Sequence, residues 1–236
     1  MAKTSLSGVV ITPAFNEALV VDDVVSRIDA LVDLDIWVIN DCSDDETASV
    51  ARAAGAMVID LPIRMGAWTA TQTGLRAARR LGYDFAITMD ADGQHDPADA
   101  LTLAAEVIYG DADVALGSCT ARGSSLRNIC WRMLRHTLGL VCNDLTSGFR
   151  VLNKEAMDVL CSEEATNLDY QDIGILLMLE RAGLKVTEVP VRMEPRKNGK
   201  SRIFHSWFTV GRYVLETLLL SMVKRNHLRA RRPTTL

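Results

Sequence analysis

The chain has 236 residues, of which 48% are hydrophobic and 24% charged, a composition that excludes fibrous and intrinsically disordered proteins. This length can bury a sizeable core, and no linker-like stretch divides the chain, so we expect one main globular domain. The formal net charge is −4, but basic residues gather in the C-terminal part, which is typical of a segment that meets phosphate, an anionic membrane surface or only solvent.

The cysteines and the N-terminal residues indicate the cellular compartment of the protein. The chain has five cysteines, an odd number without a Cys-x-x-Cys pair, which favours a reducing compartment and argues against a zinc site. The apolar run that begins at Val9 is too short for a secretory signal. We therefore expect a cytoplasmic protein.

The N-terminal part alternates short β-branched runs with amphipathic stretches. Residues 9–12 predict a strand that Pro13 ends, and apolar positions within residues 21–32 recur at helical spacing. A second strand over residues 36–39 ends at a polar run, and Gly55 closes the helix that follows.

The next elements continue this alternation. Residues 57–59 predict a third strand, and an alanine-rich helix through Arg80, closed by Gly82, leads to a fourth strand that starts at Phe85. Because parallel strands need helical crossovers, the pattern predicts an α/β fold with a mostly parallel, Rossmann-like sheet and helices on both faces.

The fourth strand ends at a cluster of acidic and amide side chains. Asp90 and Asp92 follow the apolar run directly, and Gln94 stands two positions after Asp92. Two adjacent carboxylates repel each other unless a positive charge compensates them, and carboxylate and amide oxygens are ligands that Mg²⁺ and Mn²⁺ prefer. We therefore predict a metal site of Asp90, Asp92 and Gln94, whereas Asp96, which a proline follows, is better explained as a helix N-cap.

Polar residues after the first, second and fourth strands are expected to meet. In open α/β sheets the loops at the carboxyl ends of the strands form one crevice, which would bring Pro13, Glu17, Asp41 and the Asp90-x-Asp92 pair together. The chain has no Gly-x-Gly-x-x-Gly after the first strand and no P-loop sequence, so an NAD enzyme and a P-loop nucleotide hydrolase are disfavoured. An acidic, metal-dependent site remains.

Several short motifs follow one another along the chain. They are Pro13-Ala-Phe-Asn-Glu17, Val38-Ile-Asn-Asp-Cys-Ser-Asp-Asp45, Arg64-Met-Gly66 with Gly74, and Asp90-Ala-Asp-Gly-Gln94. Downstream come Asp144-Leu-Thr-Ser-Gly-Phe-Arg150, Glu188-Val-Pro-Val191 and Arg196-x-x-Gly199-x-Ser201-Arg202. The first group resembles the donor-binding half of family-2 glycosyltransferases, and the second is similar to their polyprenyl-phosphate mannose or glucose synthase branch.

The resemblance implies a GT-A fold and the inverting transfer of a hexose from a nucleoside diphosphate sugar. It implies that Pro13, Glu17, Asp41 and Gly66 contact the sugar nucleotide. It also implies that Asp90, Asp92 and Gln94 hold Mg²⁺ or Mn²⁺ together with the diphosphate. Such a cation stabilises the negative charge that develops on the leaving nucleoside diphosphate.

The synthase branch further implies a polyprenyl phosphate as the acceptor. Because this phosphate is already ionised at neutral pH, positioning and charge compensation replace a strong base. Arginine suits this task, since its guanidinium donates two parallel hydrogen bonds to phosphate. The candidates are Arg127, Arg150, Arg196 and Arg202.

The chain departs from the family pattern at a few positions. Cys119 stands where the branch commonly has arginine, so Arg122 or Arg127 would have to replace that contact. Asn40 and Cys42 stand where the family usually has aspartate and glycine.

The segment after residue 202 is expected to form a separate element, which gives residues 1–202 as the glycosyltransferase domain and 203–236 as an apolar and basic amphipathic helix. Phe204–Val223 is apolar, but Arg212 and Glu216 interrupt it and leave a span too short to cross a bilayer. The helix fits a peripheral position at the cytosolic face of a membrane, or packing against the domain or a second subunit in an oligomer. No nucleic-acid partner is expected.

Other interpretations of the same residues stay open. The acceptor could be a saccharide or another small molecule in place of a lipid phosphate. Asp90-x-Asp92-Gly93 also resembles the nucleophile motif of haloacid-dehalogenase-type phosphatases, although Gln94 stands where threonine would be expected. A sugar-nucleotide-binding protein without turnover is the non-enzyme alternative.

Some neighbouring side chains have an ordinary structural explanation beside a functional one. Tyr170-Gln-Asp172 could lie near the acceptor or simply begin a helix, where an aspartate complements the helix dipole. Trp68 and Trp131 lie on helical segments and are expected in the core. The neighbours of His95 indicate a solvated loop in preference to a fourth metal ligand.

Overall fold

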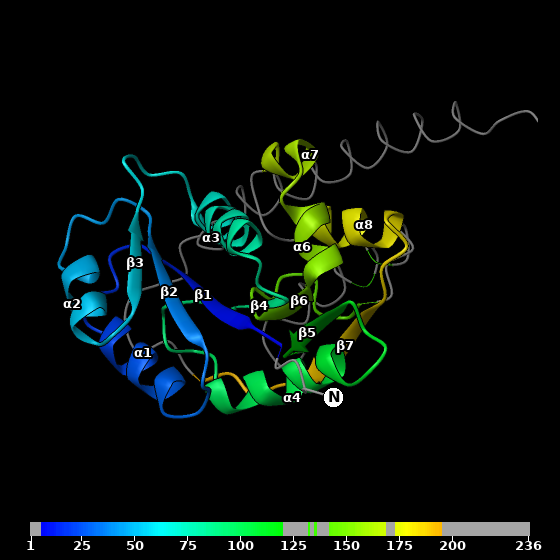
Figure 1. Ribbon diagram of the computed structural model, residues 1–236, viewed down its shortest axis with the longest axis horizontal. Coiled ribbons are helices and arrows are strands. Elements are labelled where there is room, and N and C mark those ends of the chain that lie inside the picture. The colour runs from blue at the N-terminus through cyan, green and yellow to red at the C-terminus, as the bar shows by residue number, and fades with distance from the viewer. Residues whose placement is uncertain (1–5, 120–131, 133–134, 136–141, 169–172, 195–236) are drawn as a thin grey trace, which may run out of the picture.

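The computed structural model describes residues 6–119, 132, 135, 142–168 and 173–194, and a seven-stranded sheet forms its centre (Figure 1). The strands are β1 (Gly8–Ala14), β2 (Asp35–Asn40), β3 (Met57–Asp60), β4 (Phe85–Thr88), β5 (Val114–Ser118), β6 (Arg150–Asn153) and β7 (Val186–Pro190). Their order is β3-β2-β1-β4-β6-β5-β7. Only β6 runs antiparallel to its neighbours β4 and β5, so the predicted, mostly parallel sheet is confirmed.

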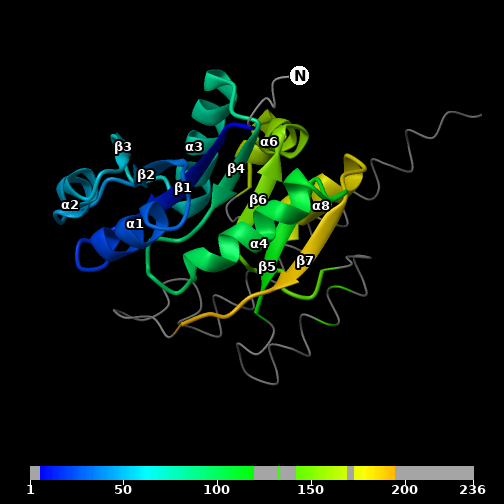
Figure 2. The same cartoon turned by 60° about the horizontal axis from the view of Figure 1, so that its bottom comes forward.

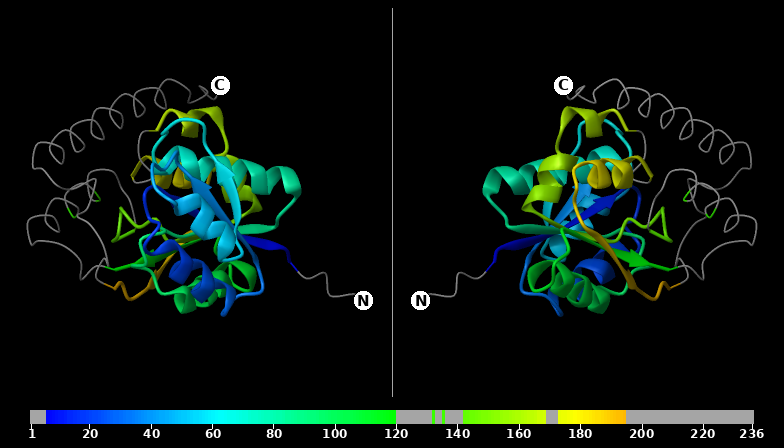
Figure 3. Two further views of the ribbon diagram at one scale, coloured as in Figure 1. Left: turned by 90° about the vertical axis from the view of Figure 1, so that its left-hand side faces the viewer. Right: turned by 90° about the vertical axis from the view of Figure 1, so that its right-hand side faces the viewer.

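Helices cover both faces of this sheet (Figures 1 and 3). They are α1 (Val21–Asp29), α2 (Thr47–Ala53), α3 (Ala67–Leu81), α4 (Pro97–Ile108), α6 (Lys154–Leu160), α7 (Glu163–Thr166) and α8 (Ile173–Arg181). Buried residues of α1, α2 and α4 join one apolar cluster, and those of α3, α6, α7 and α8 join another. The prediction of helices on both faces is therefore confirmed.

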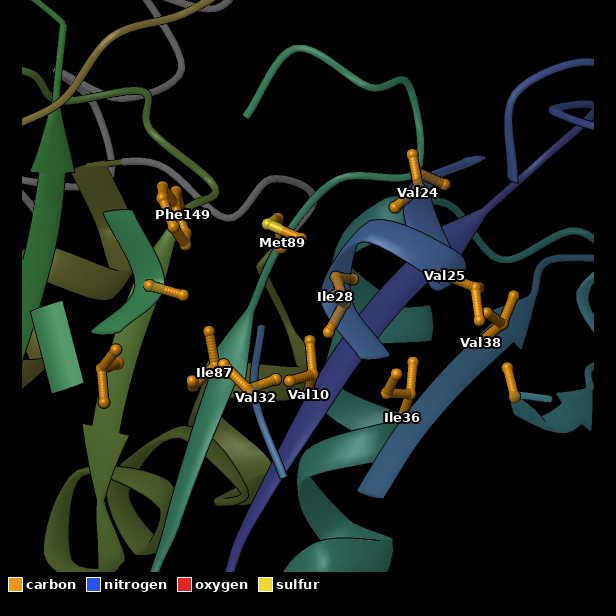
Figure 4. Packing of buried hydrophobic residues seen from close by; sticks show 14 of the residues in the cluster. Val10, Val24, Val25, Ile28, Val32, Ile36, Val38, Ile87, Met89 and Phe149 are labelled. Atoms are coloured by element: carbon orange, nitrogen blue, oxygen red, sulfur yellow. The ribbon is translucent and has the colours of Figure 1, made fainter. Parts of the chain in front are cut away.

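The two clusters follow from the alternation of side chains along each strand. Val10 and Ile87 point toward α1 and α4, whereas Ile11 and Ala86 point toward α3. Figure 4 shows Ile28 of α1 packed over the strands on the first of these faces. Because both faces are covered, β1 and β4 are apolar at nearly every position, as is usual for central parallel strands.

Helix α3 connects the N-terminal and C-terminal parts of the fold. A Cβ atom at Gly74 would come within 2.5 Å of the Ile11 side chain, so only glycine lets α3 pack this closely on β1. On another side of the helix, Trp68 and Gln72 donate hydrogen bonds to carbonyl oxygens of α7 and α6 at 2.8 and 2.9 Å. The predicted core position of Trp68 is confirmed, since this residue is buried.

Two element boundaries differ from the sequence prediction by more than one residue. β1 runs through Pro13 instead of ending there. Proline lacks an N–H group, but Pro13 faces the side on which β4 has already ended, because β4 pairs with β1 only as far as Ile11. The helix predicted within residues 21–32 ends at Asp29.

The predicted C-terminal element, residues 203–236, and the boundary at residue 202 lie outside the described residues. Within the described ranges, no helix is both long enough and apolar enough to span a membrane.

The topology creates one edge where ligands can bind. The chain moves outward from β1 to β2 and β3 and then places β4 on the other side of β1. The carboxyl ends of β1 and β4 therefore flank the point where the strand order reverses, which is where open α/β sheets bind their ligands. Because β6 is antiparallel, the loop that precedes it lies at this same edge.

Candidate active site

The acidic loop begins directly where β4 ends. The Met89 N–H still bonds to the Ile11 carbonyl oxygen at 3.1 Å, so Asp90 is the first residue beyond this pairing. The Asp90 side chain is 38% exposed, whereas Asp92 is buried, with 6% exposed. Asp92 Oδ1 accepts the backbone N–H of Gln94 at 3.1 Å, which orients the carboxylate. The predicted pair thus consists of one accessible carboxylate and one that is buried and held in place.

Gln94 connects this loop to the segment that follows β7. Its side-chain Nε2 donates to the Glu194 carbonyl oxygen at 3.1 Å, and the Glu194 N–H donates to the Gln94 carbonyl oxygen at 2.8 Å. Since Nε2 is engaged, Oε1 is the amide atom that would bind a cation. Figure 2 shows the segment after β7 running back past α4.

The prediction for His95 is wrong. The sequence indicates a solvated loop, but His95 is only 4% exposed. Its ring lies 4.9 Å from the ring of Phe149, centroid to centroid, and its backbone forms an antiparallel bridge with Met193. The segment after β7 covers this side chain, and a pairing between residues so distant in the sequence cannot be read from local polarity.

Asp96, in contrast, has the predicted role. It is the N-cap of α4 and accepts the Ala98 N–H at 3.1 Å, with Pro97 as the first helical residue. Its Oδ1 also lies 3.5 Å from the guanidinium of Arg27. Asp96 therefore fixes the start of α4 next to the acidic loop.

The loops after β1 and β2 are fastened to each other. The Asn16 N–H donates to Ser43 Oγ at 3.0 Å, and Asn16 Oδ1 accepts the Asp44 N–H at 2.8 Å. The Glu17 N–H donates to Thr47 Oγ1 at 2.9 Å. Asn16 has a φ of 54°, a left-handed conformation that asparagine tolerates better than most residues. The predicted donor-binding residue Glu17 is thus half-buried and anchored by its backbone.

Asp45 strengthens the same junction. Burial raises its pKa, but hydrogen bonds from the Thr47 hydroxyl and the Ala18 N–H outweigh burial and hold the pKa of Asp45 below its usual value. The carboxylate is therefore ionised at neutral pH and accepts hydrogen bonds from both loops.

Asp41 fastens the loop after β3. This buried carboxylate accepts the backbone N–H groups of Met65 at 2.6 Å and Gly66 at 2.8 Å, one on each oxygen. Gly66 has a φ of 87°, which few other residues adopt. The adjacent Arg64 guanidinium lies 4.0 Å above the Phe15 ring, a cation–π distance. The structure thus joins the predicted donor contacts Asp41 and Gly66 to each other.

On the other side of the acidic loop, two carboxylates hold the loop that precedes β6. Glu188 Oε1, from β7, accepts the N–H groups of Asn143 at 2.6 Å and Asp144 at 2.8 Å. Asp144 is buried, and its Oδ2 accepts the Cys119 N–H at 3.1 Å. Cys119, at the usual arginine position, therefore contributes its backbone here.

Buried groups lie next to this loop in the chain. Burial and, after it, the negative charges of Glu188 and Glu180 raise the pKa of Cys142 to about 12, against the opposing charges of Arg150 and Arg135. Arg150 itself is only 2% exposed, at the start of β6 opposite Thr88. Its predicted contact with an acceptor phosphate stays a prediction.

The remaining predicted site residues lie outside the described residues. They are Arg122, Arg127, Arg196 and Arg202, together with Tyr170-Gln-Asp172 and Trp131. Arg196 follows by two positions the residue Glu194, which bonds to Gln94.

The donor set suits a cation that is shared with a substrate. Within the described residues, no cluster of three or more histidine, cysteine, aspartate or glutamate side chains could hold a metal alone. Mg²⁺ is commonly bound by one or two carboxylates together with substrate phosphates and water. The carboxylates of Asp90 and Asp92 and the side-chain oxygen Oε1 of Gln94 fit that arrangement. Next to Asp90 lie the buried ring nitrogens of His95, which have no hydrogen-bond partner within the described residues.

Sequence reasoning missed the roles of Glu188 and Arg64. Glu188 interrupts the short strand β7, and an acid inside a strand is a usable signal for a specific partner. Arg64 carries no such signal, because its partner Phe15 lies on a different loop.

Fold and site together define a GT-A-type nucleotide-sugar enzyme. The model of the family described as "Glycosyl transferase family 2" matches residues 9–161. That match spans more than half of the chain, so the chain belongs to glycosyltransferase family 2. The family resemblance, the fold class and the prediction of a glycosyltransferase are confirmed.

The chain is similar to several individual proteins. It is 28% identical over 212 residues to polyprenol monophosphomannose synthase of Mycolicibacterium smegmatis, covering 82% of this chain and 80% of that protein. It is 28% identical over 208 residues to undecaprenyl-phosphate mannosyltransferase of Micrococcus luteus, covering 82% and 86%. A crystal structure of glucosyl-3-phosphoglycerate synthase from Mycobacterium tuberculosis, with Mn²⁺, UDP-glucose and phosphoglyceric acid, has a TM-score of 0.72 at 24% identity, covering 93% of this chain and 80% of that one.

Proposed function

We propose that this protein transfers a hexose, with inversion, from a nucleoside diphosphate sugar to a polyprenyl phosphate, and that Mg²⁺ or Mn²⁺ assists the transfer. The observation that carries the proposal is the position of Asp90 and Asp92 at the carboxyl end of β4, beside β1, where the strand order reverses. The names of the two relatives, which are a polyprenol monophosphomannose synthase and an undecaprenyl-phosphate mannosyltransferase, support the acceptor class.

The loops after β1, β2 and β3 would bind the donor. Pro13 lies near the end of β1. Glu17 and Asp41 follow β1 and β2, where hydrogen bonds fasten the loops together, and Asp41 fixes Gly66 on the third loop. A site held in this way requires little ordering when the nucleotide binds, so less binding energy is lost to entropy. The exposed Arg64 and the half-buried Phe15 offer a cationic and aromatic surface beside it.

Asp90, Asp92 and Gln94 would hold the cation and the diphosphate. When bound, the cation supplies Lewis-acid stabilisation of the charge on the leaving nucleoside diphosphate. The buried Asp92 keeps its orientation through the Gln94 N–H, and the more exposed Asp90 remains accessible to a ligand. Structural neighbours crystallised with Mn²⁺ or Mg²⁺ support this assignment.

The acceptor phosphate would be bound on the side of β5, β6 and β7. An ionised phosphate monoester needs no strong base, so the chain must orient it and balance its charge. Arg127, Arg196 and Arg202 are the proposed cationic contacts. We also propose residues 203–236 as the element that lies at a membrane surface or against a second subunit, at the cytosolic face.

A soluble acceptor is the second candidate. The fold neighbour glucosyl-3-phosphoglycerate synthase, crystallised with phosphoglyceric acid, favours it. Both candidate acceptors carry a phosphate group, so the same arginines would serve either.

The test is transfer of radiolabelled sugar from a panel of UDP and GDP sugars, with Mg²⁺ or Mn²⁺, into the organic phase of a detergent mixture that contains polyprenyl phosphate. Label in the organic phase supports the proposed acceptor and identifies the donor. Metal-dependent release of nucleoside diphosphate without organic-phase label would move the acceptor to the soluble candidates. No turnover with any donor would contradict the proposed function.

A further inference from the structure

His95 is a buried polar side chain whose ring nitrogens have no hydrogen-bond partner within the described residues. Both Nδ1 and Nε2 are fully covered, and the residue is 4% exposed. Buried polar atoms are nearly always paired in folded proteins, because an unpaired one loses its hydration without compensation. An unpaired histidine in a core therefore needs a reason.

A charged group, the Asp90 carboxylate, lies close to this ring. His95 Nε2 lies 3.6 Å from Asp90 Oδ2, slightly beyond hydrogen-bond distance. A small rotation of the exposed Asp90 side chain would close this gap, whereas the ring itself is confined. Catalytic hydrogen bonds are often long in the free protein and shorten in the substrate complex.

Ring packing against Phe149 and the backbone pairing of His95 confine the His95 side chain. The Phe149 ring lies at 4.9 Å with an interplanar angle of 44°, and Phe149 is fully buried. A Cβ atom at Gly117 would come within 3.0 Å of Phe149, so Phe149 has little room to move. The backbone of His95 is paired with Met193. A side chain confined by packing is what a precise supporting group requires.

The two acidic residues then differ in how they are oriented. Asp92 Oδ1 accepts a backbone N–H within its own turn. Asp90 is 38% exposed and is therefore the more accessible of the two carboxylates. A metal-binding carboxylate usually receives a hydrogen bond from an outer group that fixes its orientation, and His95 is in position to supply one.

We propose that His95 is a positioning residue, whose ring donates Nε2–H to Asp90 Oδ2 and so fixes the carboxylate that binds the cation and nucleoside diphosphate. This inference rests on the proposed function, because it assigns Asp90 to the metal. It makes His95 a support for a ligand and not itself a ligand.

The test uses side chains that mimic one ring nitrogen at a time. His95→Gln places an amide nitrogen near the position of Nε2, His95→Asn places one near Nδ1, and His95→Leu has neither donor. Affinity for Mn²⁺ is measured by electron paramagnetic resonance titration in the presence of UDP and, separately, GDP, so the readout does not depend on turnover.

We expect His95→Gln to bind Mn²⁺ close to the wild-type affinity, and His95→Asn and His95→Leu to bind about 10- to 100-fold more weakly. Gln72→Met is the matched control, since it removes another buried polar group that bonds to a backbone carbonyl on α6 but leaves Asp90 untouched. It should lower thermal stability without changing Mn²⁺ affinity.

Other results would overturn the inference in distinct ways. Wild-type affinity in all three variants, or an equal loss that includes His95→Gln, contradicts a role for the Nε2 donor while leaving the glycosyltransferase proposal intact. Absence of nucleotide-dependent Mn²⁺ binding in the wild-type protein would instead contradict the proposed function. If a variant does not fold, ¹⁵N NMR of the wild-type side chain with Mg²⁺ and UDP decides: the Nε2–H tautomer supports the inference and the Nδ1–H tautomer overturns it.

Discussion

The proposed donor side of the site, formed by the loops after β1, β2 and β3, and its proposed acceptor side, formed by the loop before β6, are held together in different ways. On the donor side, three loops after β1, β2 and β3 bind one another through several hydrogen bonds, with Asn16, Glu17 and Asp41 each contributing. On the acceptor side, the loop before β6 depends on Glu188 and Asp144. The donor side should therefore tolerate the loss of one contact better than the acceptor side, and the two sides should respond to substitution independently.

The largest loss of activity is expected from substitution of the acidic loop between the two sides, which carries Asp90 and Asp92. Asp92→Asn keeps Oδ1 as acceptor for the Gln94 N–H but removes the negative charge, so the fold should be preserved while metal-assisted transfer falls roughly 10³-fold. Transfer kinetics with and without metal, together with circular dichroism, check this. Near wild-type activity in a natively folded Asp92→Asn protein would refute the metal assignment.

The next effect separates the two sides. Glu188→Ala removes the acceptor of the Asn143 and Asp144 N–H groups, and bonds to a charged group contribute about 1.5–3 kcal/mol each. We expect the KM for the acceptor to rise about 10- to 100-fold, with the affinity for the nucleotide unchanged.

A graded series makes this test sharper. Glu188→Gln keeps one oxygen acceptor and should give an intermediate KM, and Thr187→Ala, on the same strand, should behave like the wild type. Equal losses of donor and acceptor affinity in Glu188→Ala would show that the two sides are one cooperative unit.

A smaller effect is expected from a single lesion on the donor side. Asp41→Asn offers one oxygen where the N–H groups of Met65 and Gly66 now meet two, so one N–H is left facing an amide donor. The free energy of unfolding should fall by about 1–2 kcal/mol, and nucleotide affinity should fall less than tenfold because the remaining loop contacts persist. Urea denaturation and calorimetric titration with UDP and GDP measure these changes, and a complete loss of nucleotide binding would contradict the proposed redundancy.

The same difference explains how much could be predicted from the sequence. The first strands and helices follow local periodicity, and Gly82 and Asp96 end and begin helices as expected. The identity of strands β5, β6 and β7 depends on pairing across the sheet, so local periodicity does not predict them. The burial of His95 has the same cause, since it arises from the pairing with Met193.

For the candidate site, the sequence locates residues but not their partners. The positions of Asp90 and Asp92 follow from an apolar run that stops at carboxylates, which is a local signal. That Asp41 binds the backbone at Gly66 depends on the conformation of the loop after β3, which no periodicity encodes. The sequence therefore predicts the position of a candidate site residue where that residue follows a strand end. It does not predict the hydrogen bonds that hold the residue in place.

The smallest predicted effect concerns strain on the donor side. Cys42 has a φ of 56°, a conformation that costs a residue with a side chain about 1–2 kcal/mol, and its Sγ makes only a long contact of 3.9 Å to the Pro62 carbonyl oxygen. Cys42→Gly removes this strain but adds about 0.5–1 kcal/mol of backbone entropy cost on folding. We expect a net gain of about 0.5 kcal/mol in the free energy of unfolding, with unchanged nucleotide affinity, as measured by urea denaturation. Cys42→Ala keeps the strain and should show no gain, so equal stabilisation by both substitutions would mean that the thiol, and not the backbone, is the source of the instability.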